Sequence, residues 1–132
     1  MRCVIVDDSA AFRDAAAGML ERAGVTVVAM ASTTSEALRQ CRDLRPDVTL
    51  VDVDLGDESG FDLAEALYRA DPLAPRVILI STHDEQDLAE MIATSPALGF
   101  LPKFALSAEA IRDLLANADR TAEPTVTAPP GT

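Results

Sequence analysis

The chain has 132 residues, a length that fits one domain able to bury its own hydrophobic core. Acidic side chains outnumber basic ones by 22 to 11, and the resulting net charge of −11 disfavours nucleic acid and anionic membranes as partners. Hydrophobic residues make up 48% of the chain, which argues against disorder despite this charge. Cys3 and Cys41 are too few for a disulfide framework and match no metal-ligand spacing. We therefore expect reduced, buried cysteines in a cytoplasmic protein.

Five apolar runs alternate along the chain with five segments of helical character. The runs are almost continuously hydrophobic, as is typical of strands covered on both faces, and lie at residues 3–6, 25–31, 48–51, 77–80 and 99–101. The helical segments lie at residues 9–23, 35–44, 59–70, 85–94 and 107–118. This alternation predicts an α/β fold with a doubly wound, five-stranded parallel sheet of order 2-1-3-4-5 and helices on both faces.

We expect one domain over residues 1–119. Residues 120–132 contain three prolines and no apolar periodicity, and are expected to form a disordered tail or part of a linker. The longest uncharged stretches, residues 23–35 and 91–102, are shorter than the roughly 20 apolar residues that span a bilayer.

Polar residues follow four of the five predicted strands. They are Asp7 and Asp8 after the first strand, Asp52 after the third, Ser81 after the fourth and Lys103 after the fifth. In the predicted order these four strands are neighbours, and ligand chemistry in such sheets collects at the carboxyl ends of the strands. Lys103 is also the only lysine in the chain. The five side chains are therefore expected to form one site.

Each of these residues also has a structural explanation when it is taken singly. Asp8 or Ser9 could cap the first helix, and Ser81 could be a turn residue. Asp52 could begin a loop, and Lys103 could be a solvated surface amine. The joint arrangement favours the functional interpretation over these explanations.

The residue types indicate metal-assisted phosphoryl transfer. Grouped carboxylates repel one another, so a hard divalent cation such as Mg²⁺ is expected between them. A carboxylate can also attack phosphorus to give an aspartyl phosphate, a transfer that needs charge neutralisation more than acid–base help. Asp52 is the expected nucleophile because its strand is central, with Asp7 and Asp8 as metal ligands. Ser81 and Lys103 would supply a hydroxyl and an ammonium to the phosphoryl oxygens.

Over residues 1–119 the chain resembles the receiver domain of two-component response regulators, of the free-standing, single-domain type. Four segments in the family's order carry the resemblance: VIVDDS, PDVTLVDVDLGDESGFDL, VILIST and GFLPK. The resemblance implies that Asp52 is the phosphoacceptor and that Asp7, Asp8, Asp52 and the backbone carbonyl of Asp54 hold Mg²⁺ or Mn²⁺. It further implies that Ser81 and Phe100 are the switch residues and that Lys103 is the site lysine.

The resemblance also implies the partners. The phosphoryl donor would be a sensor histidine kinase or a phosphotransfer protein, and the output would be an unidentified protein target. The switching surface would comprise residues 85–94, 99–101 and 107–118, and it could also support a homodimer. No direct nucleic acid contact, no membrane contact and no turnover of a separate substrate are expected, only self-catalysed phosphoryl transfer and autodephosphorylation.

Departures from the family pattern leave alternatives open. Gly56 and Phe104 stand where the family often has proline, and Thr82 replaces a smaller residue. These departures motivate an alternative, a pseudo-receiver that acts as a protein interaction module without phosphorylation, although all five site residues are retained. The Asp52-Val-Asp54 sequence also resembles the D-x-D signature of haloacid-dehalogenase-type phosphatases, but there the signature follows the first strand. A flavodoxin-type carrier shares the fold class, but an acidic pair after the first strand disfavours a flavin phosphate.

Overall fold

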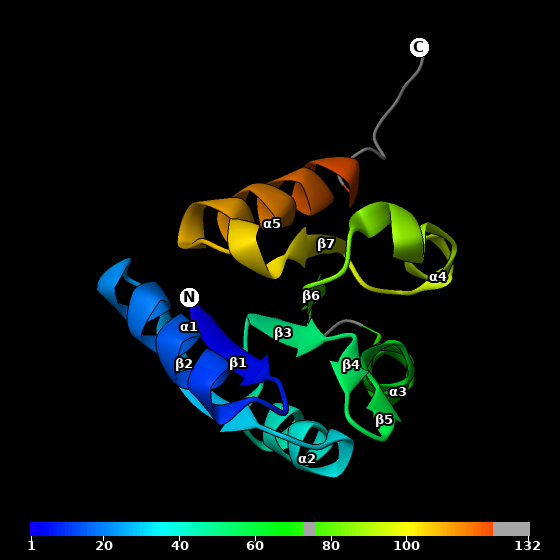
Figure 1. The fold of residues 1–132 in the computed structure, drawn as a ribbon. Coiled ribbons are helices and arrows are strands. Elements are labelled where there is room, and N and C mark those ends of the chain that lie inside the picture. The colour runs from blue at the N-terminus through cyan, green and yellow to red at the C-terminus, as the bar shows by residue number, and fades with distance from the viewer. Residues whose placement is uncertain (73–75, 123–132) are drawn as a thin grey trace.

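The apolar runs form a parallel sheet in the order expected from the sequence (Figure 1). The structure, a computed structural model, describes residues 1–72 and 76–122. Within these ranges the sheet has five strands in the order β2-β1-β3-β6-β7. The strands are β1 (Arg2–Val6), β2 (Thr26–Ala31), β3 (Val48–Asp52), β6 (Arg76–Ser81) and β7 (Gly99–Pro102). The predicted order 2-1-3-4-5 is confirmed, since β4 and β5 belong to a separate hairpin.

Helices cover both faces of the sheet, as the predicted right-handed crossovers require (Figure 1). They are α1 (Ala10–Arg22), α2 (Thr34–Leu44), α3 (Gly60–Ala70), α4 (Ala89–Thr94) and α5 (Ala108–Ala122). One core cluster joins the sheet to α1 and α5, and it includes Ile5, Leu20 and Ile111. A second cluster joins the opposite face to α2 and α3, and it includes Leu63 and Leu67.

Strand register places the first and third strands level at their carboxyl ends. Val6 of β1 pairs with Val51 of β3, and Asp52 in turn pairs with Ile80 of β6. Because parallel strands in register end together, the residues that follow Val6 and Val51 lie side by side at one edge of the sheet. The fold itself therefore brings Asp7 next to Asp52.

Two predicted helices differ from the structure. The fourth, expected over residues 85–94, begins as a 3-10 turn (Glu85–Leu88), and only Ala89–Thr94 is α-helical. None of residues 82–99 is buried, so this part of the chain has few apolar contacts to hold a longer helix. The fifth continues four residues beyond its expected end, to Ala122, and so includes the first residues of the expected tail. Residues 123–132 of that tail lie outside the described residues.

A short hairpin that the sequence did not predict connects β3 to α3. Its strands, β4 (Asp54–Leu55) and β5 (Glu58–Ser59), are antiparallel. Gly56 is the first residue of the two-residue loop and has φ 72°, a conformation that type II′ hairpins assign to glycine. Glu58 accepts a hydrogen bond from the amide of Thr34 at 2.8 Å, which ties the hairpin to the start of α2.

Gly60, the first residue of α3, packs directly on the backbone of Asp52. Its amide donates to the carbonyl of Val53 at 2.9 Å. A Cβ atom at this position would overlap the carbonyl oxygen of Asp52, so no other residue fits without moving the strand end. Gly60 therefore fixes the distance between α3 and the end of β3.

We expect Gly60→Ala to lower the free energy of unfolding by about 1–3 kcal/mol, since a methyl group must be forced against backbone. Gly18→Ala is the matched control. The added Cβ there meets only the flexible end of Arg22, and the gain in helix propensity should raise stability by about 0.5–1 kcal/mol. Urea unfolding followed by circular dichroism measures both. Equal stability of Gly60→Ala and the unmodified protein would contradict the close packing.

Candidate functional site

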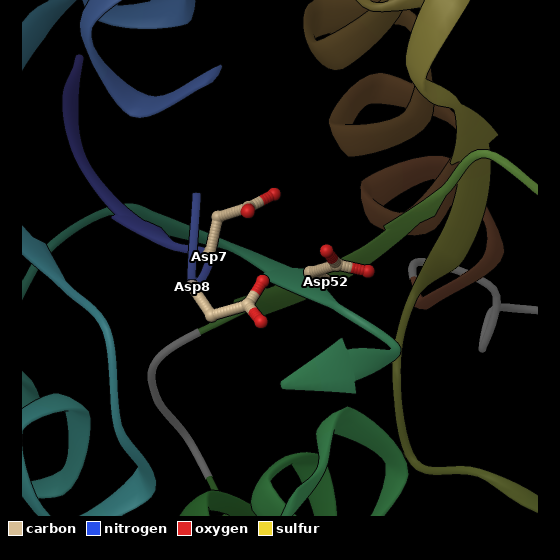
Figure 2. Close-up of side chains that lie close together, drawn as sticks. All are labelled: Asp7, Asp8 and Asp52. Carbon is tan, nitrogen blue, oxygen red and sulfur yellow. The ribbon is translucent and has the colours of Figure 1, made fainter. Parts of the chain in front are cut away.

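Three carboxylates gather at the carboxyl ends of β1 and β3 (Figure 2). One ligand atom from each of Asp7, Asp8 and Asp52 lies within 4.8 Å of the others. Asp7 and Asp52 are buried, whereas Asp8 is exposed. Ser9, not Asp8, caps α1, because its hydroxyl oxygen accepts the hydrogen bond from the amide of Phe12. The capping explanation for Asp8 is therefore wrong, and its carboxylate lies beside the other two.

Lys103 lies between the two buried carboxylates. Its ammonium nitrogen is 2.7 Å from Asp7 Oδ2 and 3.0 Å from Asp52 Oδ2. Lys103 begins a 3-10 turn (Lys103–Ala105) directly after β7, so Phe104 in place of proline does not keep the ammonium away from the site. The site then holds three carboxylates against one ammonium.

Backbone amides hold the remaining carboxylate oxygens in place. The amide of Ser9 donates to Asp7 Oδ1 at 2.8 Å, and the amide of Asp54 donates to Asp52 Oδ1 at 3.0 Å. Each bond joins residues two apart, so the turn after each strand orients the carboxylate that precedes it. Both buried carboxylates are thus oriented before any ligand binds.

Burial changes the acidity of the site. Burial raises the pKa of Asp52 to about 6, and the charge of Asp7 acts in the same direction. Hydrogen bonds from the Asp54 amide and Lys103 oppose this rise without cancelling it. For Lys103, burial lowers the pKa, but hydrogen bonds to Asp7 and Asp52 outweigh burial, and its pKa is raised. The ammonium therefore stays charged while the Asp52 carboxylate carries an energetic cost.

The other predicted residues lie on the neighbouring strands. Ser81 is buried at the end of β6, and its hydroxyl oxygen accepts a hydrogen bond from the amide of His83 at 2.9 Å. Phe100 is buried on β7 in the core cluster that contacts α3. Asp54 is exposed on β4, and the role of its carbonyl as a metal ligand stays a prediction. His83 is exposed, as expected for an isolated loop residue.

Sequence reasoning missed two residues that contact the site. The Phe12 ring lies under the Lys103 ammonium, with its centroid 4.2 Å from the nitrogen. The Arg13 guanidinium donates to the backbone carbonyl of Asp7 at 2.6 Å. Both lie in the first turn of α1, where the sequence pattern indicated only a helix. Only their position in the chain, shortly after Asp7 and Asp8, indicated that they could lie near the site.

The donor set fits a divalent cation. Carboxylate oxygens are the ligands that Mg²⁺ prefers, and it commonly takes one or two carboxylates together with waters and a phosphoryl oxygen. A further positive charge would also relieve the repulsion that one ammonium leaves among three carboxylates.

Comparison with known proteins agrees with this geometry. The sequence profile of the response regulator receiver domain matches residues 3–116. The sensory transduction protein LytT of Enterococcus faecalis is 36% identical over 67% of this chain and 36% of its own length. The probable transcriptional regulatory protein NarL of Mycobacterium tuberculosis is 34% identical over 87% of this chain and 53% of its own length. The chain thus spans about a third to a half of these two relatives.

Solved structures show the same fold. The signal receiver domain of M. tuberculosis NarL superposes with a TM-score of 0.76 at 34% identity, covering 89% of this chain and 95% of that one. A response regulator from Burkholderia pseudomallei, solved with a phosphorylated aspartic acid and a calcium ion, gives a TM-score of 0.77 at 26% identity, covering 92% of this chain and 70% of that one. The chain belongs to the response regulator receiver domain family. No helix among the described residues is long and apolar enough to cross a bilayer.

The raised pKa of Asp52 predicts a pH-dependent stability difference between the protein and Asp52→Asn. The folded state holds the Asp52 proton up to about pH 6, while an unfolded aspartate releases it near 3.8. The folded state therefore binds more protons in this window, and ionisation of Asp52 destabilises it as pH rises through the window. In the absence of divalent cations, Asp52→Asn should gain stability relative to the unmodified protein from about pH 4 to pH 6, approaching 2–3 kcal/mol.

Urea unfolding of both proteins across this pH range, in a chelator, measures the difference. Asp113→Asn is the control, because it makes the same substitution at an exposed position on α5, outside the carboxylate cluster. A stability difference for Asp52→Asn that stays constant from pH 4 to pH 7 would contradict the pKa of Asp52.

Proposed function

We propose that this receiver domain accepts one phosphoryl group on Asp52 from a phosphohistidine of a sensor histidine kinase or phosphotransfer protein. The observation that carries the proposal is the position of the Asp52 carboxylate, at the end of a central strand between an acidic pair and the one lysine of the chain. The backbone of Asp52 has little space to move toward α3, because Gly60 packs against it. The carboxylate is therefore held at a fixed place at the sheet edge.

The transfer is a displacement at phosphorus. A carboxylate oxygen of Asp52 forms a bond to phosphorus while the bond from phosphorus to the donor imidazole nitrogen breaks. The electron pair of the broken bond stays on the imidazole. The Lys103 ammonium contacts the Asp52 carboxylate, so it is close enough to stabilise the negative charge of the phosphoryl oxygens after the transfer. The Ser81 hydroxyl, on the neighbouring strand, is the proposed donor to another of these oxygens.

Asp7, Asp8 and Asp52, with the backbone carbonyl of Asp54, are the proposed ligands of Mg²⁺ or Mn²⁺. When bound, the ion neutralises the negative charge shared by the carboxylates and the phosphoryl oxygens. Asp8 is the exposed member of the cluster, so its carboxylate would be accessible to an ion from solvent. The phosphorylated aspartic acid and calcium ion of the Burkholderia structure belong to that protein, and they support the same combination here.

The proposed output surface is α4, β7 and α5. Phe100 of β7 lies in the core cluster that joins the sheet to α2 and α3. Leu88 and Ile92, which belong to the segment 82–99, are partly buried and pack against this cluster. A phosphoryl group on Asp52 carries about −1.5 to −2 charges, in place of the single charge of the carboxylate. Movement of Ser81 and Phe100 would shift the population of conformations of this segment, and with it the affinity for a protein target or a second copy of the chain. The domain would act by this change of binding, without turnover of a separate substrate.

Phosphorylation by a small donor separates this function from a phosphorylation-independent interaction module. With acetyl phosphate and Mg²⁺, we expect the protein to gain the mass of one phosphoryl group, measured by intact mass spectrometry. Asp52→Asn should gain none, while Asp54→Asn, which keeps the backbone carbonyl, should still be modified. No mass gain, or an equal gain in Asp52→Asn, would favour the interaction module.

Mg²⁺ binding should stabilise the fold. A ligand present at 100 times its Kd adds about 2.7 kcal/mol to the free energy of unfolding. We expect Mg²⁺ to raise Tm in the unmodified protein and in the control Asp113→Asn, and to raise it much less in Asp8→Asn. The apo Tm of Asp8→Asn should be at least that of the unmodified protein, because a like charge is removed. An equal Mg²⁺ shift in all three proteins would exclude Asp8 as a ligand.

A further inference from the structure

Among the residues that the structure describes, three groups surround the Lys103 ammonium, which has little contact with solvent. Two are the carboxylates of Asp7 and Asp52, and the third is the face of the Phe12 ring, 4.2 Å from the nitrogen. The Lys103 side chain is only 16% exposed. A cation within about 6 Å of an aromatic centroid is attracted by the ring, most strongly when water is excluded. The ring therefore contributes an attraction in addition to its packing.

The position of the ring is coupled to the site through a short chain of hydrogen bonds. The amide of Ser9 donates to Asp7 Oδ1 at 2.8 Å, and the hydroxyl oxygen of Ser9 accepts from the amide of Phe12 at 3.2 Å. The Phe12 side chain is half-buried and packs against the core cluster under α1. The backbone of Phe12 is thus linked to Asp7 through Ser9.

We propose that Phe12 is a positioning residue for phosphoryl transfer, whose ring holds the Lys103 ammonium over the acceptor site. This inference rests on the proposed function of Asp52. During the transfer Asp52 exchanges its carboxylate charge for a phosphoryl group whose charge lies further out, so the ammonium must move with it. The ring is uncharged and takes no part in the bond changes. It can therefore support the ammonium before and after the transfer.

The alternative is that Phe12 only fills space in the core. Leucine at this position separates the two roles, because it keeps an apolar side chain under α1 but removes the aromatic face. Tyrosine keeps the face. Phe104 provides a matched control, since it is a second phenylalanine adjacent to Lys103 in the chain but is 86% exposed. Phe104→Leu makes the same chemical change outside the packed site.

The single lysine of the chain makes the contact directly measurable. Protein grown with isotope-labelled lysine gives NMR signals from Lys103 alone. Protons above a ring face are shifted upfield, so the terminal methylene protons of Lys103 should resonate upfield of those in a free lysine side chain. We expect this shift in the unmodified protein, Phe12→Tyr and Phe104→Leu, and its loss in Phe12→Leu. Circular dichroism and urea unfolding of each variant establish that it is folded.

Phosphorylation rates with acetyl phosphate and Mg²⁺ provide the second measurement. Phe12→Leu should react about 2- to 30-fold more slowly than the unmodified protein, the range that corresponds to the strength of a cation–π contact. Phe12→Tyr and Phe104→Leu should react at rates close to the unmodified protein. The rates are compared at saturating Mg²⁺, so that a change in metal affinity does not alter the measured rate of phosphorylation.

The outcomes separate this inference from the proposed function. An upfield shift that survives in Phe12→Leu, or that is absent from the unmodified protein, overturns the ring contact whether or not the protein is phosphorylated. An unchanged rate in folded Phe12→Leu overturns the positioning role alone. Absence of any phosphorylation in the unmodified protein overturns the proposed function and this inference together.

Discussion

The rest of the site depends on the placement of one ammonium between two buried carboxylates. Asp7 and Asp52 end neighbouring parallel strands in register, so the fold brings two like charges together. Without Lys103 at 2.7 and 3.0 Å, neither charge would have a cation among the described residues. Even with it, the pKa of Asp52 is raised to about 6, which means that ionising the acceptor costs free energy. The same cost provides the driving force for a divalent cation, because a second positive charge relieves the remaining repulsion.

Rigid packing surrounds the acceptor. Amides of Ser9 and Asp54 orient the carboxylates, and Gly60 leaves no space for the end of β3 to move toward α3. Preorganised groups of this kind lose little free energy in reorganisation when charge develops on a ligand. The hairpin β4–β5 has a related effect, since Gly56 brings its loop close to the Asp8 carboxylate and Glu58 joins it to α2.

The opposite condition holds at residues 82–99, none of which is buried. This segment has little apolar packing, and it directly follows Ser81, which belongs to the proposed site. Segments of low local stability are those whose conformation a small change in charge can shift. Ser81 is the last buried residue before this segment and Phe100 is the next buried residue after it, so the two predicted switch residues flank the segment.

Most of the fold and most of the candidate site follow from local pattern. Continuous apolar runs and their alternation with helical segments predicted the strand order. The polar residues at strand ends predicted a common site, and the structure brings Asp7, Asp8, Asp52 and Lys103 together. Local pattern could not predict features that arise from contacts distant in sequence. The 3-10 start of the fourth helix reflects missing burial. The hairpin is joined to α2 by the hydrogen bond from the Thr34 amide to Glu58, 24 residues further along the chain.

The sequence by itself therefore determined the sheet order and the acidic cluster, because strand hydrophobicity and strand ends are local properties. Only the tertiary structure decided how the charges are compensated. The contacts of Lys103 with Asp7, Asp52 and the Phe12 ring join residues up to about a hundred positions apart, and no periodicity in the chain relates them. The net charge of −11 indicated an acidic protein, and the folded site explains why part of that charge is buried beside a single lysine.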